Sequence, residues 1–182
     1  MYTMTDFFSK HILNENNNKI IGLAHLLFAI FIAFYGIVFK KMWFDYVYII
    51  YAILVLISWT YYNGECPLTY YIKKQQDNSY IAGEESTDIN DMYLLFGSKD
   101  IIYTIITITI IFNVISEFIV LKRNNYPAYI YFALPFFHFL YTLLLRTQSK
   151  LYENPTFLFL QNGFRYIFIV VFIFVFSKII YK

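Results

Sequence analysis

Residues 101–121 read IIYTIITITIIFNVISEFIVL, and this stretch decides the fold class. Glu117 is its only charged side chain. At about 1.5 Å per residue, a helix of this length crosses the roughly 30 Å of hydrocarbon in a bilayer. A membrane β-barrel needs alternating strands at about ten-residue spacing, a pattern that the chain lacks. Because a helix satisfies its own backbone polar groups in lipid, we expect a transmembrane helix here.

Similar apolar stretches recur along the chain and predict an all-α, multi-pass transmembrane bundle of five helices. The other four stretches are residues 20–39, 43–61, 127–145 and 157–180. Residues 1–19 form a polar N-terminal tail in this interpretation, and residues 20–182 form a single transmembrane domain. The one long connection, at about 62–100, is polar and contains turn-forming residues, so we expect mostly loop there.

The composition supports a membrane protein. The 182 residues are 59% hydrophobic and 14% charged, whereas soluble domains carry about 45–50% apolar and about 25% charged residues. A net charge of +2 gives no indication of a nucleic-acid partner. The single cysteine, Cys66, excludes an internal disulfide and a CxxC motif. The partners we expect are the lipid bilayer and other membrane proteins or a second copy, and no cofactor is indicated.

Five crossings place the two termini on opposite sides of the membrane. Compact basic turns, Lys40-Lys41 and Lys122-Arg123, lie on the C-terminal side. Basic residues in short loops favour the cytoplasm, which predicts a cytoplasmic C-terminus and a non-cytoplasmic N-terminus. The opposite orientation is favoured by basic residues on the other side, namely Lys73, Lys74, Arg146 and Lys150.

Polar groups at membrane depth are costly and are therefore candidates for function. Three predicted helices each present one polar or small-residue stripe at helical spacing: Thr109, Asn113 and Glu117; His138, Thr142 and Arg146; and Gly22, His25, Ala29, Ala33 and Gly36. We expect the stripes to face a shared axis. They either hold the helices together through hydrogen bonds and close packing or line a functional cavity.

Two histidines of different helices lie at a similar predicted depth, about 8–10 Å from the N-terminal side. The turn that follows the second helix emerges on the same side, so we expect both imidazoles to meet beneath it. The candidate catalytic residues are His25, His138, Glu65 and Cys66, and the same four are the candidate metal ligands. Imidazole, thiolate and carboxylate are metal ligands, and imidazole with carboxylate can also perform acid–base chemistry. Glu117 and Asp45 are expected near the opposite side, too far away to join.

A second set of polar residues is interpreted as structural. Its members are Trp59, Asn63, Thr69, Asn113, Glu117, Arg146 and Arg165. Asn63-Gly64 is a turn-forming pair. The packing interpretation also remains open for the two histidines and for Cys66, because a membrane histidine commonly serves as a hydrogen-bonded packing residue.

A histidine early in the first helix, an aromatic residue near the end of the second and the turn Cys66-Pro67-Leu68-Thr69 form a recognisable pattern. Over about residues 20–121 the chain resembles a small membrane-protein family known as domain of unknown function 2784. The resemblance implies that His25, Trp59, Cys66 and Thr69 form one cluster at the N-terminal side. It implies no activity, because the family has none established. The chain departs from the family pattern after the turn, where Tyr70 to Lys73 replace a proline and an acidic residue.

Three functions are compatible with these residues. The leading interpretation is a structural or partner-binding membrane component without catalytic activity. The first alternative is a membrane-embedded enzyme or metal-binding protein that uses the His/Glu/Cys cluster. The second is a small transporter or channel subunit, which requires a water-filled path at Glu117. The sequence does not decide whether the chain is an enzyme, but it favours a protein without catalytic activity.

Overall fold

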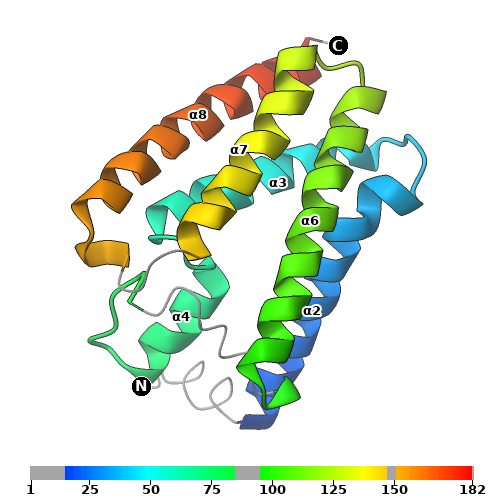
Figure 1. The fold of residues 1–182 in the computed structure, drawn as a ribbon. Helices are drawn as coiled ribbons and strands as arrows, with labels where there is room; N and C mark the ends of the chain where they lie inside the picture. Colours follow the sequence, from blue (N-terminus) through cyan, green and yellow to red (C-terminus); the bar gives the residue numbers. More distant parts are fainter. Residues whose placement is uncertain (1–14, 85–94, 147–150, 182) are drawn as a thin grey trace, which may run out of the picture.

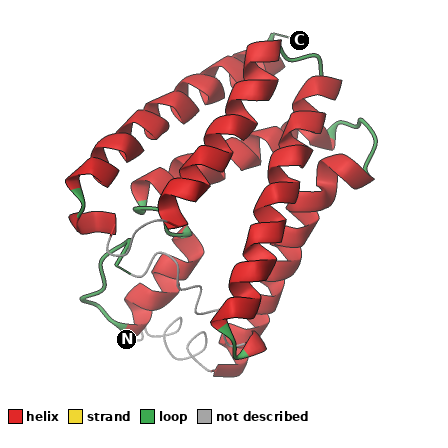
Figure 2. Ribbon diagram, in the orientation of Figure 1, coloured by secondary structure: helices red, strands yellow, loops and turns green. Residues whose placement is uncertain are grey.

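The computed structural model describes residues 15–84, 95–146 and 151–181, and its long elements are helices (Figure 2). They are α2 (Glu15–Val38), α3 (Phe44–Tyr61), α6 (Lys99–Arg123), α7 (Ala128–Arg146) and α8 (Pro155–Ile180). All five are long and apolar enough to cross a membrane. The predicted fold class is therefore confirmed. α2 begins at Glu15, inside the stretch predicted to be the polar tail, and residues 1–14 lie outside the described part.

A shorter helix, α4 (Pro67–Gln76), lies in the connection that we expected to be mostly loop. Proline stands at its first turn, where the missing N–H costs no hydrogen bond and the fixed φ angle suits a helix. The sequence Asn63-Gly64 forms the expected turn before it, and both residues have positive φ angles of 50° and 87°. The proline was thus a helix start rather than a sign of continued loop. A 3-10 turn, η1 (Leu151–Glu153), precedes α8.

The helices alternate in direction, and neighbours in sequence are not always neighbours in space (Figure 1). α2 packs along α6, α6 along α7, and α3 along α8. We call the end of the bundle at which α2 begins the N-terminal side, and the end at which α8 ends the C-terminal side. Large side chains fill the interior between the helices, including Tyr35, Tyr48, Leu121, Tyr141 and Phe168.

Gly36, the last member of the small-residue stripe on α2, faces α6 and allows the two backbones to approach closely. A Cβ atom added to Gly36 would lie 2.9 Å from the Ser116 Cα atom. The Gly36 backbone N–H donates to the Ser116 hydroxyl. Glycine at this position therefore sets the distance between α2 and α6, in the way small residues do in membrane helix pairs.

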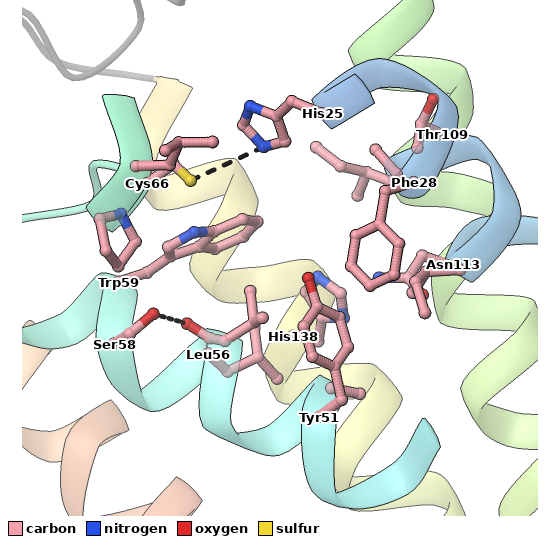
Figure 3. A pocket seen from close by; sticks show the side chains of 17 residues that line it. His25, Phe28, Tyr51, Leu56, Ser58, Trp59, Cys66, Thr109, Asn113 and His138 are labelled. Carbon is pink, nitrogen blue, oxygen red and sulfur yellow. Dashed lines mark hydrogen bonds between the residues drawn. The ribbon is translucent and has the colours of Figure 1, made fainter. Parts of the chain in front are cut away.

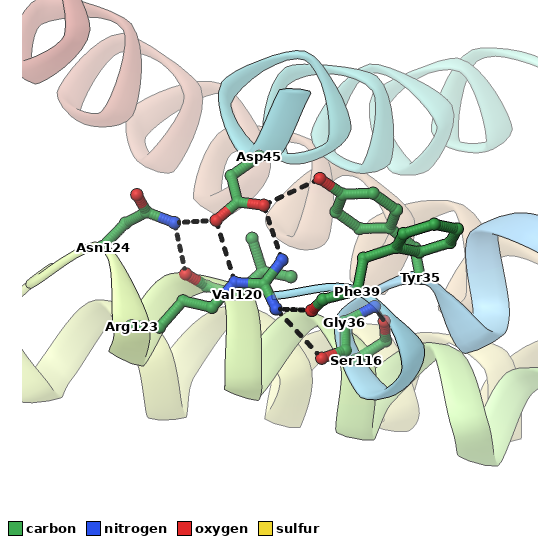
Figure 4. Close-up of polar contacts among 8 residues, drawn as sticks. All are labelled: Tyr35, Gly36, Phe39, Asp45, Ser116, Val120, Arg123 and Asn124. Atoms are coloured by element: carbon green, nitrogen blue, oxygen red, sulfur yellow. Dashed lines mark hydrogen bonds and ion pairs between the residues drawn. The ribbon is translucent and has the colours of Figure 1, made fainter. Parts of the chain in front are cut away.

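A buried polar network joins α2, α3 and α6 at the C-terminal side (Figure 4). Asp45 is fully buried, and its two carboxylate oxygens accept from the Tyr35 hydroxyl at 2.7 Å, the Arg123 Nε at 2.8 Å and the Asn124 amide at 2.6 Å. Arg123 also donates to the backbone carbonyls of Gly36 and Phe39. We call these groups the C-terminal lock. The lock fixes how far the three helices are shifted along the bundle axis relative to one another. It thereby also sets the depth of the residues further along each helix.

Candidate functional site

Cys66 lies at the N-cap of α4, directly after the Asn63-Gly64 turn. Its sulfur is 3.7 Å from the His25 Nε2 atom on α2, and the backbone N–H groups of Thr69 and Leu68 bond to the sulfur. Burial raises the pKa of the Cys66 thiol, but His25 and the two N–H groups favour the thiolate more strongly. The pKa of this thiol consequently lies below its usual value.

His138 is bonded to a residue that we expected to lie too far away. Its Nδ1 atom is 2.8 Å from a carboxylate oxygen of Glu117, and the two side chains are 2% and 1% exposed. The expected separation was wrong because it counted residues along the helices. A Cα–Cβ bond tilts toward the N-terminus of its own helix. Since α6 and α7 run in opposite directions, the two side chains lean toward each other.

The same rule explains why the two histidines have different partners. α2 begins at the N-terminal side, so His25 leans toward that side and reaches Cys66. His138 leans the opposite way and reaches Glu117. The expected meeting of the two imidazoles beneath the cysteine turn is replaced by two separate pairs.

Both pairs contribute to one cavity of about 320 Å³ between α2, α3, α4, α6 and α7 (Figure 3). His25 and Cys66 line one part, and His138 lines another, as the close-up shows. Further polar lining comes from Trp59, Thr109 and Asn113. The rest is largely apolar, and includes Phe28, Ile32, Val55, Leu56 and Ile110. The cavity therefore combines an apolar wall with a few polar groups, as small-molecule sites do.

Two buried nitrogen atoms of the lining lack a hydrogen-bond partner among the residues that the structure describes. They are the Trp59 Nε1 and the His138 Nε2. Their rings lie edge to face, with centroids 6.2 Å apart. Buried polar atoms are nearly always bonded, and each exception calls for an explanation. Both side chains also line the cavity.

Glu65 does not line this cavity, contrary to the expected convergence of four candidates. Its carboxylate bonds to Lys73 at 3.0 Å, to the Tyr80 hydroxyl at 2.9 Å and to the Gly83 backbone N–H at 3.3 Å. Glu65 and Lys73 are almost fully buried. The acid thus holds the segment after α4 against that helix. This pairing was missed because it depends on α4, which the sequence analysis did not predict.

The described part of the chain contains no group of three or more His, Cys, Asp or Glu side chains that would hold a metal ion. His25 and Cys66 form a pair, while His138 and Glu65 are bonded elsewhere. A structural zinc site uses four such ligands and a catalytic one uses three. Within the described residues, the four candidates therefore do not form a three-ligand group.

Comparison with known proteins gives no match. Neither the family models, nor the curated proteins, nor the solved structures contain one that resembles this chain detectably. The resemblance to domain of unknown function 2784 stays a prediction.

The residues interpreted as structural are distributed over several contacts. Asn113 accepts from the Tyr48 hydroxyl at 3.1 Å, and Asn63 bonds to Gln161 at 3.0 Å. Arg165 donates to the Thr60 hydroxyl and its guanidinium lies 4.2 Å from the Tyr61 ring centre. The side chain of Arg146 lies outside the described residues. Sequence reasoning missed the C-terminal lock, although an acid in the first turn of one helix and a base in the last turn of another were visible signals.

Proposed function

We propose that this chain is an integral membrane protein that binds a small amphiphile in the cavity between its helices. The observation that carries the proposal is the pair of unpartnered buried nitrogens, Trp59 Nε1 and His138 Nε2, on one cavity. An unbonded buried donor or acceptor costs about 1–3 kcal/mol. A ligand that bonds to both atoms removes this cost, whereas pure helix packing leaves it in place.

The two nitrogens indicate the polar group of the ligand. An indole N–H can only donate. When the His138 Nδ1–H donates to the Glu117 carboxylate, the His138 Nε2 is an acceptor. A hydroxyl group is able to accept from Trp59 and donate to His138 at the same time. The apolar wall around Phe28, Ile32 and Leu56 suits an alkyl chain. A long-chain alcohol or a lipid-like hydroxyl compound therefore fits the cavity chemically.

Fluorescence quenching of Trp59 tests the proposal. The chain has two tryptophans, and Trp43 is 74% exposed, so the Trp43→Phe variant leaves Trp59 as the single reporter. We expect 11-bromoundecan-1-ol in lipid nanodiscs to quench Trp59 saturably, since bromine quenches indole on contact. We expect 1-bromoundecane, which lacks the hydroxyl, to bind about 30-fold more weakly, because it loses two hydrogen bonds worth about 1 kcal/mol each.

Two matched alanine substitutions on α2 serve as the control. Ala29 lines the cavity, and Ala29→Leu fills part of it. Ala24 lies on the same helix with its side chain exposed, and Ala24→Leu adds the same volume outside. We expect saturable quenching to disappear in the first variant and to persist in the second. Equal quenching in both variants would indicate that the alcohol reaches Trp59 from the bilayer, and the binding proposal would then be wrong.

The transport alternative receives less support. Within the described residues, Glu117 is 1% exposed and lines neither this cavity nor the shallower one beside Gly163 on α8. Its carboxylate bonds to His138 instead. A purely structural role is the outcome if neither bromo compound quenches Trp59 saturably.

We further propose that the C-terminal side faces the cytoplasm, on the basis of the two compact basic turns there. In a Cys66→Ala chain, a cysteine at exposed Asp77 reports on the N-terminal side and one at exposed Lys40 on the other. A membrane-impermeant maleimide added to intact cells should label Asp77→Cys and spare Lys40→Cys. The reverse labelling would contradict this orientation.

A further inference from the structure

The Cys66–His25 pair has a geometry that simple packing does not require. An imidazole nitrogen lies 3.7 Å from the sulfur, and the first N–H groups of α4 bond to the same sulfur. An adjacent imidazole and a helix N-terminus are the two features that most commonly activate a cysteine as a nucleophile.

A second observation beside this thiol concerns His138. His138 is 2% exposed, its Nε2 has no partner among the described residues, and it lines the same cavity as Cys66. Trp59 adds an unpartnered N–H to that cavity. A molecule that satisfies these nitrogens occupies the space that also contains the sulfur (Figure 3).

We propose that Cys66 is a nucleophile that accepts an acyl group from an ester or thioester of a long-chain acyl amphiphile bound in the cavity. This inference rests on the proposed binding function and names the substrate class of the same site. The apolar wall holds the acyl chain, and the polar groups hold the carbonyl end.

The transfer requires no oxidant or reductant. The Cys66 thiolate attacks the carbonyl carbon and forms an S–C bond, while the carbonyl electron pair moves to oxygen. As the intermediate collapses, the bond from the carbonyl carbon to the leaving oxygen or sulfur breaks, and the electron pair departs with that atom. His25 takes the thiol proton when the thiolate forms and returns it from Nε2 to the leaving group. Water then attacks the thioester carbonyl carbon while His25 accepts a proton from it. The S–C bond breaks, the fatty acid is released, and His25 returns the proton to the sulfur.

The surroundings suit the charges that develop. The pKa of the Cys66 thiol is lowered by His25 and the α4 backbone despite the opposing effect of burial, so the reactive thiolate is favoured. The Trp59 indole supplies an unused donor for an oxyanion in the cavity.

The experiment uses the full chain in lipid nanodiscs with p-nitrophenyl octanoate and, in a parallel arm, S-phenyl thiooctanoate. Cys66 is the only cysteine in the chain, so an octanoyl thioester can form at one residue. We expect a burst of one leaving group per chain and an octanoyl mass on the Cys66 peptide that hydroxylamine removes. The control is an Asp77→Cys thiol in the Cys66→Ala chain, exposed after the last turn of α4. Cys66 should react at least about 100-fold faster, the scale of general acid–base assistance.

Two variants separate this inference from the binding proposal. His25→Asn should slow acylation about 100-fold, while saturable quenching of Trp59 by 11-bromoundecan-1-ol persists, because the hydroxyl bonds to Trp59 and His138 rather than to His25. Cys66→Ala should abolish the burst and also retain the quenching. Retained quenching with a Cys66 thiol that reacts no faster than the Asp77→Cys thiol would overturn the inference and leave the binding proposal standing. If 11-bromoundecan-1-ol fails to quench Trp59 saturably in the chain with an unmodified cavity, both the binding proposal and this inference are overturned.

Discussion

The two ends of the bundle satisfy their buried polar groups in different ways. At the C-terminal side, both oxygens of Asp45 accept hydrogen bonds from Tyr35, Arg123 and Asn124. Toward the N-terminal side, the Trp59 and His138 nitrogens on the cavity lack partners among the described residues. The Asn124 Oδ1 is the one atom of the lock in the same condition. A network whose charged groups are all bonded indicates a role in holding helices together. Two unbonded nitrogens on one cavity are instead the basis for proposing that another molecule binds there.

The two ends also differ in how their buried carboxylates are paired. Asp45 is paired with a cation and contributes to the alignment of three helices. Glu117 is paired with a single imidazole, and its second oxygen has no partner among the described residues. Substitutions at the two ends should therefore differ in how much stability they remove and in whether ligand binding changes.

The largest effect is expected at the lock. Asp45→Ala leaves the Arg123 guanidinium, which is 15% exposed, without its carboxylate, and breaking such a buried pair costs about 3–5 kcal/mol. We expect a loss of that size in the free energy of unfolding measured in detergent micelles. Lys122→Ala is the control, because Lys122 is exposed at the same end. The double variant Asp45→Leu/Arg123→Met should recover part of the loss, since it leaves no unpaired charge. An Asp45→Ala variant as stable as the parent would remove the distinction between the two ends.

The next effect is expected at the His138–Glu117 pair. His138→Leu leaves a buried carboxylate with no bond to either oxygen, which costs roughly 3 kcal/mol, the upper end of the range for an unsatisfied group. It should also weaken quenching by 11-bromoundecan-1-ol, because the hydroxyl acceptor is lost. The double variant Glu117→Leu/His138→Leu should regain stability and still bind the alcohol weakly. Unchanged binding in both variants would show that His138 belongs with the structural residues.

The sequence predicted the membrane-spanning helices better than it predicted which buried polar side chains bond to one another. Long apolar runs with few charges identified the five spans, because their length and composition are properties of each segment alone. His25 and Cys66 were expected close together and lie 3.7 Å apart. That prediction succeeded because the cysteine directly follows the end of a span at the same side as His25, so that counting residues gives the depth.

The unpredicted contacts depend on geometry that residue counting omits. Glu117 reaches His138 because antiparallel helices direct their side chains toward each other. Glu65 turns away from the cavity because Lys73 lies on a helix that the sequence analysis did not predict. Asp45 and Arg123 meet because α3 begins and α6 ends at the same level, which follows from the packing of the whole bundle. The acid and the base at these helix ends were visible in the sequence, but neither residue identifies its partner.

A smaller effect is expected where α2 and α6 approach each other at the lock. Gly36→Ala introduces a methyl group 2.9 Å from the Ser116 Cα, and overpacking of this kind costs about 2 kcal/mol. The matched control is Gly163→Ala on α8, where no atom lies within 4 Å of the added Cβ and alanine stabilises a helix by roughly 0.5–1 kcal/mol. Thermal unfolding should therefore shift down in the first variant and up in the second. A shift in the same direction for both would mean that glycine does not set the helix distance.

The smallest effect on stability, and the most informative one, is expected for Trp59→Phe. The indole N–H has no acceptor among the described residues, so its removal breaks no bond within the protein. We expect the free energy of unfolding to change by less than about 1 kcal/mol. Because the reporter tryptophan is removed, binding is measured by competition for tritiated undecanol, and its affinity should fall about fivefold or more with the loss of one hydrogen bond. A donor that served packing would give the opposite result, with lower stability and unchanged affinity. This one substitution therefore decides whether the unsatisfied end of the bundle is a binding site or an imperfectly packed core.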